Sequence, residues 1–160
     1  MNTLPDSFPS LMPYFAVSDG AGAMEFYKLA FGATELYRLV DPQSGKIGHA
    51  EMMLNDHVIM LSDEYPQHCP TPQTLGGTTM RLCLMVDDVD ASVERARAAG
   101  ATVTMEPKDQ FYGHRSAQVR DPFGHEWLLQ HEIERVLPDE MQRRWDAMVA
   151  GGAQCEPAES

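Results

Sequence analysis

His49 and Glu51 are the two residues of this chain whose types and spacing point most directly to chemistry. Residues two apart in a β-strand project from the same face of the sheet, so a strand here places an imidazole beside a carboxylate. Such a pair can act as a general acid and base, or can hold a metal ion with a third donor. The alternative is structural: Glu51 forms a buried ion pair with Arg81 or Arg120, and His49 is its hydrogen-bonded neighbour.

Alternation along the other expected strands predicts which residues face the same side as this pair, because every second residue of a strand shares a face. The face is expected to combine charged, aromatic and sulfur-containing side chains. His114 is expected in a loop at its rim. The candidate ligand-binding residues are therefore Tyr14, Met60, Arg81, Cys83, His114, Gln118, Arg120 and Glu126.

The strands that must position these residues belong to a unit that occurs twice. Asp19 begins a helical stretch that ends at Gly32, and Asp87 lies just before one that ends at Gly100. The two aspartates and the two glycines are each 68 positions apart. A constant offset predicts a repeated structural unit. Each copy reads as strand, helix and three further strands, so we predict an α+β fold of two βαβββ units.

The expected domain boundaries follow from this repeat. We place the first βαβββ unit at 1–64, a Pro- and Gly-rich linker loop at 65–78, and the second unit at 79–132. A linker of this length can cover a site. Residues 133–160 are expected to be a C-terminal helix and tail, in which Met141, Trp145 and Met148 share one side. This pattern is typical of a helix docked on the body or on a neighbouring subunit.

Composition limits the possible partners. The net charge is −12, from 12 Lys+Arg against 24 Asp+Glu, which disfavours nucleic acid because phosphate binding needs clustered cations. An acidic surface favours solubility and can attract a cationic ligand. No apolar run reaches the roughly 18 residues of a membrane span, and residues 1–10 lack the pattern of a secretion signal. Three cysteines without CxxC spacing predict free thiols and a cytoplasmic protein.

Several segments resemble one known superfamily. The repeat, with the turn 121–125 (Asp-Pro-Phe-Gly-His) between its last two strands, is similar to the vicinal oxygen chelate superfamily of glyoxalase I, extradiol dioxygenases, and bleomycin- and fosfomycin-resistance proteins. Segments 26–33, 48–52, 58–64, 111–115 and 138–144 resemble its PhnB-like (demethylubiquinone-methyltransferase-like) branch. The resemblance implies that two curved sheets form a cup for a small molecule, and that the protein is a homodimer.

The resemblance also implies a divalent metal held in the cup by four His, Glu or Gln side chains. The matching positions are Met12, Met60, Arg81 and Leu128, and the first and third can shift by one to Pro13 and Met80. None of these is a suitable ligand for a hard or borderline divalent cation. We therefore expect no metal at the standard site, and a metal only at an off-pattern site that includes the His49–Glu51 pair.

Two functions remain open at this point. The first is a glyoxalase-like protein that binds or transforms a small ligand in the cup, which the pair of His49 and Glu51 favours. The second is a metal-free sequestering protein of bleomycin-resistance type, which the net charge of −12 and the missing metal ligands favour. Whether the protein is an enzyme is not decided by the sequence.

Overall fold

The fold repeats one βαβββ unit, as predicted. The computed structural model describes residues 9–65 and 67–151. The first unit comprises β1 (Tyr14–Val17), α1 (Gly20–Phe31), β2 (Thr34–Val40), β3 (Ile47–Leu54) and β4 (His57–Asp63). The second comprises β5 (Arg81–Met85), α3 (Val89–Ala98), β6 (Thr102–Asp109), β7 (His114–Arg120) and β8 (Glu126–Glu132). The linker contains α2 (Pro72–Leu75), and the chain continues into α4 (Pro138–Ala150).

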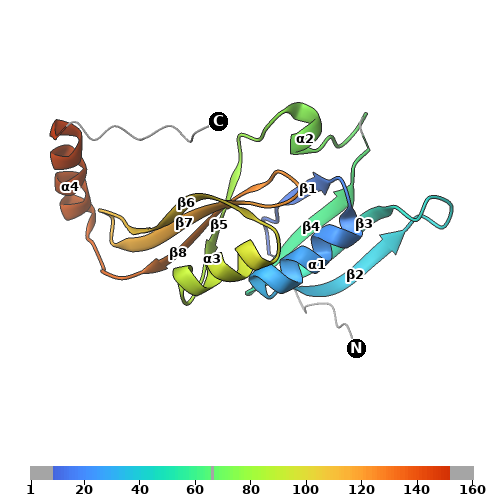
Figure 1. The fold of residues 1–160 in the computed structure, drawn as a ribbon, viewed down its shortest axis with the longest axis horizontal. Coiled ribbons are helices and arrows are strands. Elements are labelled where there is room, and N and C mark those ends of the chain that lie inside the picture. Colours follow the sequence, from blue (N-terminus) through green and yellow to red (C-terminus); the bar gives the residue numbers. More distant parts are fainter. Residues whose placement is uncertain (1–8, 66, 152–160) are drawn as a thin grey trace.

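Each unit forms its own four-stranded mixed sheet. The strand orders are β1-β4-β3-β2 and β5-β8-β7-β6, with one parallel pair in each sheet, β1 with β4 and β5 with β8. Figure 1 shows the two sheets side by side along the molecule, with α1 and α3 next to each other. The helices cover one face of the sheets, and the opposite face is called the open face below.

The helices begin and end where the sequence predicted. The side chain of Asp19 accepts a hydrogen bond from the Gly22 amide at the start of α1. Asp88 accepts the equivalent bond from Ala91 at the start of α3. Such side chains satisfy amide groups that have no partner within the helix. Gly32 ends α1 with a φ of 72°, a left-handed conformation that suits glycine.

One hydrophobic core lies between the sheets and the helices α1 and α3, and it joins both units. The turns between the last two strands of each unit also cross to the other unit. His125 Nε2 donates to the Ala16 carbonyl oxygen of β1 over 2.8 Å. Asn55 Nδ2 donates to the Met85 carbonyl oxygen of β5 over 3.0 Å. These reciprocal contacts fix the relative position of the two sheets.

The linker is more regular than the loop that we expected. Thr71 is buried and begins the short helix α2. Gln73 Nε2 donates to the Pro122 carbonyl oxygen over 2.9 Å, and Pro72 lies close to Gly124. The linker therefore packs on the turn between β7 and β8.

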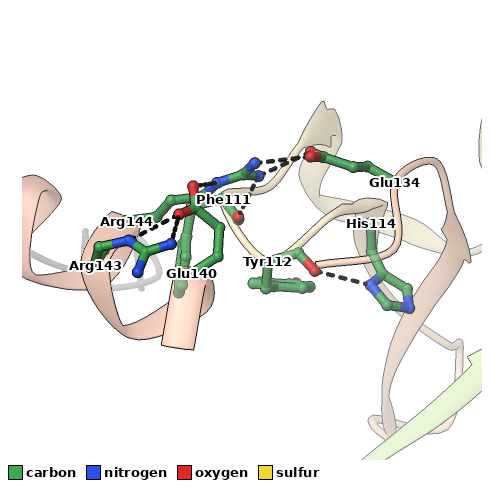
Figure 2. A network of polar contacts seen from close by, with 7 residues as sticks. All are labelled: Phe111, Tyr112, His114, Glu134, Glu140, Arg143 and Arg144. Carbon is green, nitrogen blue, oxygen red and sulfur yellow. Dashed lines mark hydrogen bonds and ion pairs between the residues drawn. The ribbon is translucent and has the colours of Figure 1, made fainter. Parts of the chain in front are cut away.

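Helix α4 lies beyond the end of the second sheet, and none of its residues is buried. Figure 2 shows what holds it: the Arg144 guanidinium donates to Glu134 at 2.7 and 2.8 Å and to the Phe111 carbonyl oxygen at 3.1 Å. It also donates to Glu140 of the same helix at 2.8 Å. The Trp145 ring packs 5.6 Å from the Phe111 ring. The predicted docking on the body is thus made at one end of β6 and β7.

No helix of the described residues is long and apolar enough to cross a membrane.

Candidate ligand site on the open face of the first sheet

Strand register gathers the predicted residues of the first unit into one group. Tyr14 pairs with Met60, Met60 with Glu51, and Glu51 with Tyr37, which makes a row across β1, β4, β3 and β2. Paired residues on neighbouring strands project to the same side of a sheet, and His49 shares that side with Glu51. The neighbouring Ala50 and Met52 are fully buried on the helix side. We call Tyr14, Tyr37, His49, Glu51 and Met60 the Glu51 cluster.

The carboxylate of Glu51 is the centre of this cluster. Tyr37 donates its hydroxyl to Glu51 Oε1 over 2.7 Å, and His49 Nε2 lies 3.3 Å from the same oxygen. The hydrogen bond to Glu51, together with desolvation, raises the pKa of Tyr37, which keeps its hydroxyl a donor. Only 6% of Glu51 is exposed. The second oxygen, Oε2, is buried and has no hydrogen-bond partner among the described residues.

An unpaired buried carboxylate oxygen is unusual. Most buried polar atoms in proteins have a partner, and leaving one unpaired costs about 1–3 kcal/mol, more when the group is charged. The ion pair that we considered, between Glu51 and Arg81 or Arg120, is not formed. Among the described residues, the sole ion-pair partner of Glu51 is His49. Arg120 instead donates to Glu126 over 2.7 Å.

Aromatic rings border the carboxylate. The Tyr14 ring lies 5.5 Å from the His49 ring, in an edge-to-face arrangement, and the Tyr37 ring lies 5.7 Å from it on another side. Tyr14 is half exposed, so solvent reaches one wall of the cluster. The cluster therefore combines a buried acceptor, a histidine and two tyrosine rings at the surface of the sheet.

Tyr37 belongs to the site but was not among the predicted residues, because β2 contains a bulge. Glu35 pairs with Met52, whereas Tyr37 pairs with Glu51, so Leu36 is an extra residue between them. Glu35 projects to the helix side, where it binds Lys28 of α1. Simple alternation would place Tyr37 on that side too, and the bulge turns it to the open face. The sequence carries no plain signal for this shift.

The remaining candidates lie on the open face of the second sheet. Glu126 of β8 pairs with Arg81 on one side and Arg120 on the other, and Leu128 of β8 pairs in the same way with Cys83 and Gln118. Cys83 is exposed. Partial desolvation still raises the pKa of its thiol, and Gln130 donates to its sulfur over 3.1 Å.

These two sets stay apart within one chain. No hydrogen bond or ion pair among residues 9–65 and 67–151 joins the Glu51 cluster to Arg81, Gln118, Arg120 or Glu126. Figure 1 agrees, since the two sheets lie side by side. We expected His114 in a loop, but it is the first residue of β7. Its Nδ1 lies 3.5 Å from the Tyr112 carbonyl oxygen, near the contacts of α4 (Figure 2). The predicted residues thus form two separate groups, with His114 distant from the Glu51 cluster.

The side chains at the positions of the implied metal site do not fit a divalent cation. Met60 lies on the open face of the first sheet, Arg81 and Leu128 lie on that of the second, and Met12 precedes β1. A thioether, a guanidinium and an alkyl group provide no hard donor. In the described part of the chain, no three His, Cys, Asp or Glu side chains are grouped so as to hold a metal.

Comparison with known proteins agrees with this architecture. Residues 10–129 match the model of the Glyoxalase/Bleomycin resistance protein/Dioxygenase superfamily. The chain belongs to this superfamily. The uncharacterized protein Rv0887c of Mycobacterium tuberculosis is 45% identical over 138 residues, which cover 84% of this chain and 81% of the relative. The uncharacterized protein Mb0911c of Mycobacterium bovis is equally similar and is covered to 90%.

Solved structures of the superfamily share the fold. TioX from Micromonospora sp. ML1 is 26% identical, with a TM-score of 0.61, over 78% of this chain and 98% of TioX. A glyoxalase/bleomycin resistance protein from Streptomyces sp. CB03234 is 27% identical, with a TM-score of 0.54, over 75% of this chain and 97% of that protein. The fosfomycin resistance protein FosX from Listeria monocytogenes, in complex with Mn(II), is 19% identical, with a TM-score of 0.60, over 85% of this chain and 98% of FosX. At this identity FosX shows the shared fold alone.

Proposed function

We propose that this protein binds a small organic ligand on the open face of the first sheet, at the Glu51 cluster. The supporting observation is the carboxylate of Glu51, whose Oε1 is held by Tyr37 while Oε2 is buried without a partner. A hydrogen-bond donor on a ligand would satisfy this oxygen. Ligand sites combine apolar walls with a few well-placed polar groups, and Tyr14, Met60 and Glu51 provide both.

We further propose that binding does not use the superfamily's metal. The four positions that correspond to its ligands carry Met12, Met60, Arg81 and Leu128, which lack hard donors. This favours a metal-free binding or sequestering function of bleomycin-resistance type.

A crystallographic fragment soak tests the location of the site. Crystals of the wild type and of Glu51→Ala are soaked with one library of neutral, cationic and anionic fragments. We expect fragments within hydrogen-bond distance of Glu51 in the wild type, and their loss in the variant. Fragments bound only on the second sheet, or retained in Glu51→Ala, would contradict the proposal.

A second candidate function is acid–base transformation of the ligand at the same cluster. It is favoured by His49 Nε2, which lies 3.3 Å from Glu51 Oε1 and can exchange a proton with a bound molecule. Incubating a bound compound with the protein and recovering it separates the two functions. Unchanged compound indicates binding alone, whereas a product that is lost with His49→Ala indicates an enzyme.

We also propose a homodimer, in which a second copy covers exposed apolar side chains of the second unit. Met80 and Met85 are each close to half exposed, although they are large and apolar. Exposed apolar surface of this kind is typical of association sites, and the superfamily resemblance implies a dimer. Sedimentation should give the mass of two chains for the wild type and of one chain for Met85→Glu. A monomeric wild type would contradict this assembly.

The cytoplasm is the compartment that we propose. Cys69 and Cys83 are free thiols in the structure, and unpaired thiols fit a reducing environment.

A further inference from the structure

We infer that the ligand is an organic ammonium ion, in which a protonated amine is attached to an aromatic or apolar body. The amine would donate to Glu51 Oε2, and the body would lie against Tyr14 and Met60. This inference rests on the proposed function, because it names the class of ligand for the same site.

Glu51 differs from the other buried acidic residues of the structure. Asp63 accepts from the Gly20 amide over 2.7 Å with one oxygen and from the Ile47 amide over 2.6 Å with the other. Asp121 accepts two hydrogen bonds on each of its oxygens. Glu51 accepts on Oε1 and has no described partner on Oε2. The fold therefore satisfies both oxygens of its structural carboxylates and leaves one oxygen of Glu51 for another donor.

The charge of the missing donor follows from the surroundings of Glu51. No lysine or arginine of the described residues lies within ion-pair distance of it, so its charge has no cationic partner other than the titratable His49. A buried carboxylate is stabilised far more by a cation than by a neutral group. An anionic ligand would be repelled, and the overall charge of −12 raises the local concentration of cations around the protein.

The apolar part of the ligand follows from the walls of the cluster. Tyrosine rings attract cations through their faces, and Tyr14 is half exposed in the row that contains Glu51. Met60 lies between Tyr14 and Glu51 in this row, and its flexible thioether suits contact with an aromatic ring. A bare ammonium ion would leave these walls uncovered, whereas an arylalkylamine covers them.

Calorimetric titration with three matched probes tests this class. Benzylammonium carries the charge, benzyl alcohol replaces it with a neutral donor, and benzoate reverses it. We expect benzylammonium to bind the wild type at least about 10-fold more tightly than benzyl alcohol, as for hydrogen bonds to charged groups, and benzoate not to bind. Glu51→Gln should remove this preference, and Tyr14→Leu should weaken benzylammonium binding by roughly 2- to 5-fold, the range of a surface cation–π contact.

Glu126→Gln is the matched control, because it makes the same change in charge at a carboxylate that Arg120 already occupies on the second sheet. It should leave benzylammonium affinity unchanged. An equal loss in both variants would assign the effect to overall charge and overturn the inference. Equal or tighter binding of benzyl alcohol or benzoate at the Glu51 cluster would overturn the ligand class while leaving the proposed function intact. Weak fragments still bind at tens of millimolar, so an absence of benzylammonium binding up to that concentration would also overturn the inference. The fragment soak would then decide the proposed function separately.

Discussion

Tyr27 of the first unit donates its hydroxyl to Asp121 Oδ2 of the second unit over 2.8 Å, and both residues are buried. Trp127 Nε1 donates to the same oxygen over 3.0 Å. The amides of Phe123 and His125 donate to Oδ1, each over 2.9 Å. Burial, together with the nearby Asp121, raises the pKa of Tyr27 well above its usual value, so the phenol remains a donor. This bond connects the two repeats inside their common core.

Tyr27→Phe is therefore expected to lower the free energy of unfolding by about 1–3 kcal/mol, because Asp121 loses a donor in a buried place. Urea unfolding measures the change. Tyr14→Phe is the control, since Tyr14 is half exposed and surface substitutions usually change stability by less than about 0.5 kcal/mol. Equal effects of the two substitutions would show that the Tyr27 bond does not stabilise the fold.

The repeat made most of this fold predictable from the sequence. Asp19 and Gly32 begin and end α1 as their types require. The offset of 68 positions predicted α3 to within one residue, because its N-cap is Asp88 and its C-cap is Ala99 rather than Asp87 and Gly100. Alternation also assigned Glu51 and Cys83 to the open faces correctly. These features are local, so they depend on spacing and residue type alone.

The composition of the site was less predictable, because it depends on details that are not periodic. The bulge at Leu36 brings Tyr37 to Glu51, and nothing in the residue pattern marks it. Alternation also cannot tell whether residues on the open faces of two different sheets lie close enough to form one site. Arg120 has the right face but pairs with Glu126 of its own sheet, so it does not reach Glu51.

Gly113 is a position at which the backbone of the fold requires glycine. Its φ is +84°, and an added Cβ would overlap the carbonyl oxygen of Glu134. Gly45 has a similar φ of +73° with open space around it. Gly45→Ala should lower the free energy of unfolding by roughly 1–2 kcal/mol through backbone strain alone, and Gly113→Ala should lower it further. Thermal melts that rank the two variants in the opposite order would contradict this reading.

Docking of α4 should depend on pH. The hydrogen bonds from Arg144 lower the pKa of Glu134, which lies outside α4, below the ordinary glutamate value of 4.5. Because its pKa is lowered, the ionised Glu134 stabilises the docked state at a pH above the ordinary glutamate pKa. This stabilisation is lost as the pH falls through the lowered pKa of Glu134. Subtracting the fluorescence of Trp145→Phe from that of the wild type isolates the emission of Trp145. This emission should change below about pH 4.5. The same transition in an Arg144→Gln background would exclude Arg144 as its cause.

Glu51→Gln separates a ligand-binding residue from a structural one. If Glu51 stabilised the fold through a buried ion pair, the variant would lose about 1–3 kcal/mol of unfolding free energy. The structure gives Glu51 no arginine partner and leaves Oε2 unpaired. We therefore expect unchanged or higher stability in urea, with weaker benzylammonium binding. A clear loss of stability would contradict this expectation.

The most direct measurement is an NMR titration of methionine methyl groups labelled with ¹³C. Met60 lies beside Glu51 on the first sheet, and Met85 lies on the open face of the second. Signals are assigned with Met60→Leu and Met85→Leu. On addition of benzylammonium, we predict that the Met60 signal shifts with saturation while the Met85 signal stays in place, and that Glu51→Gln abolishes the shift. Saturable shifts at Met85 with none at Met60 would show that the ligand site is not the Glu51 cluster.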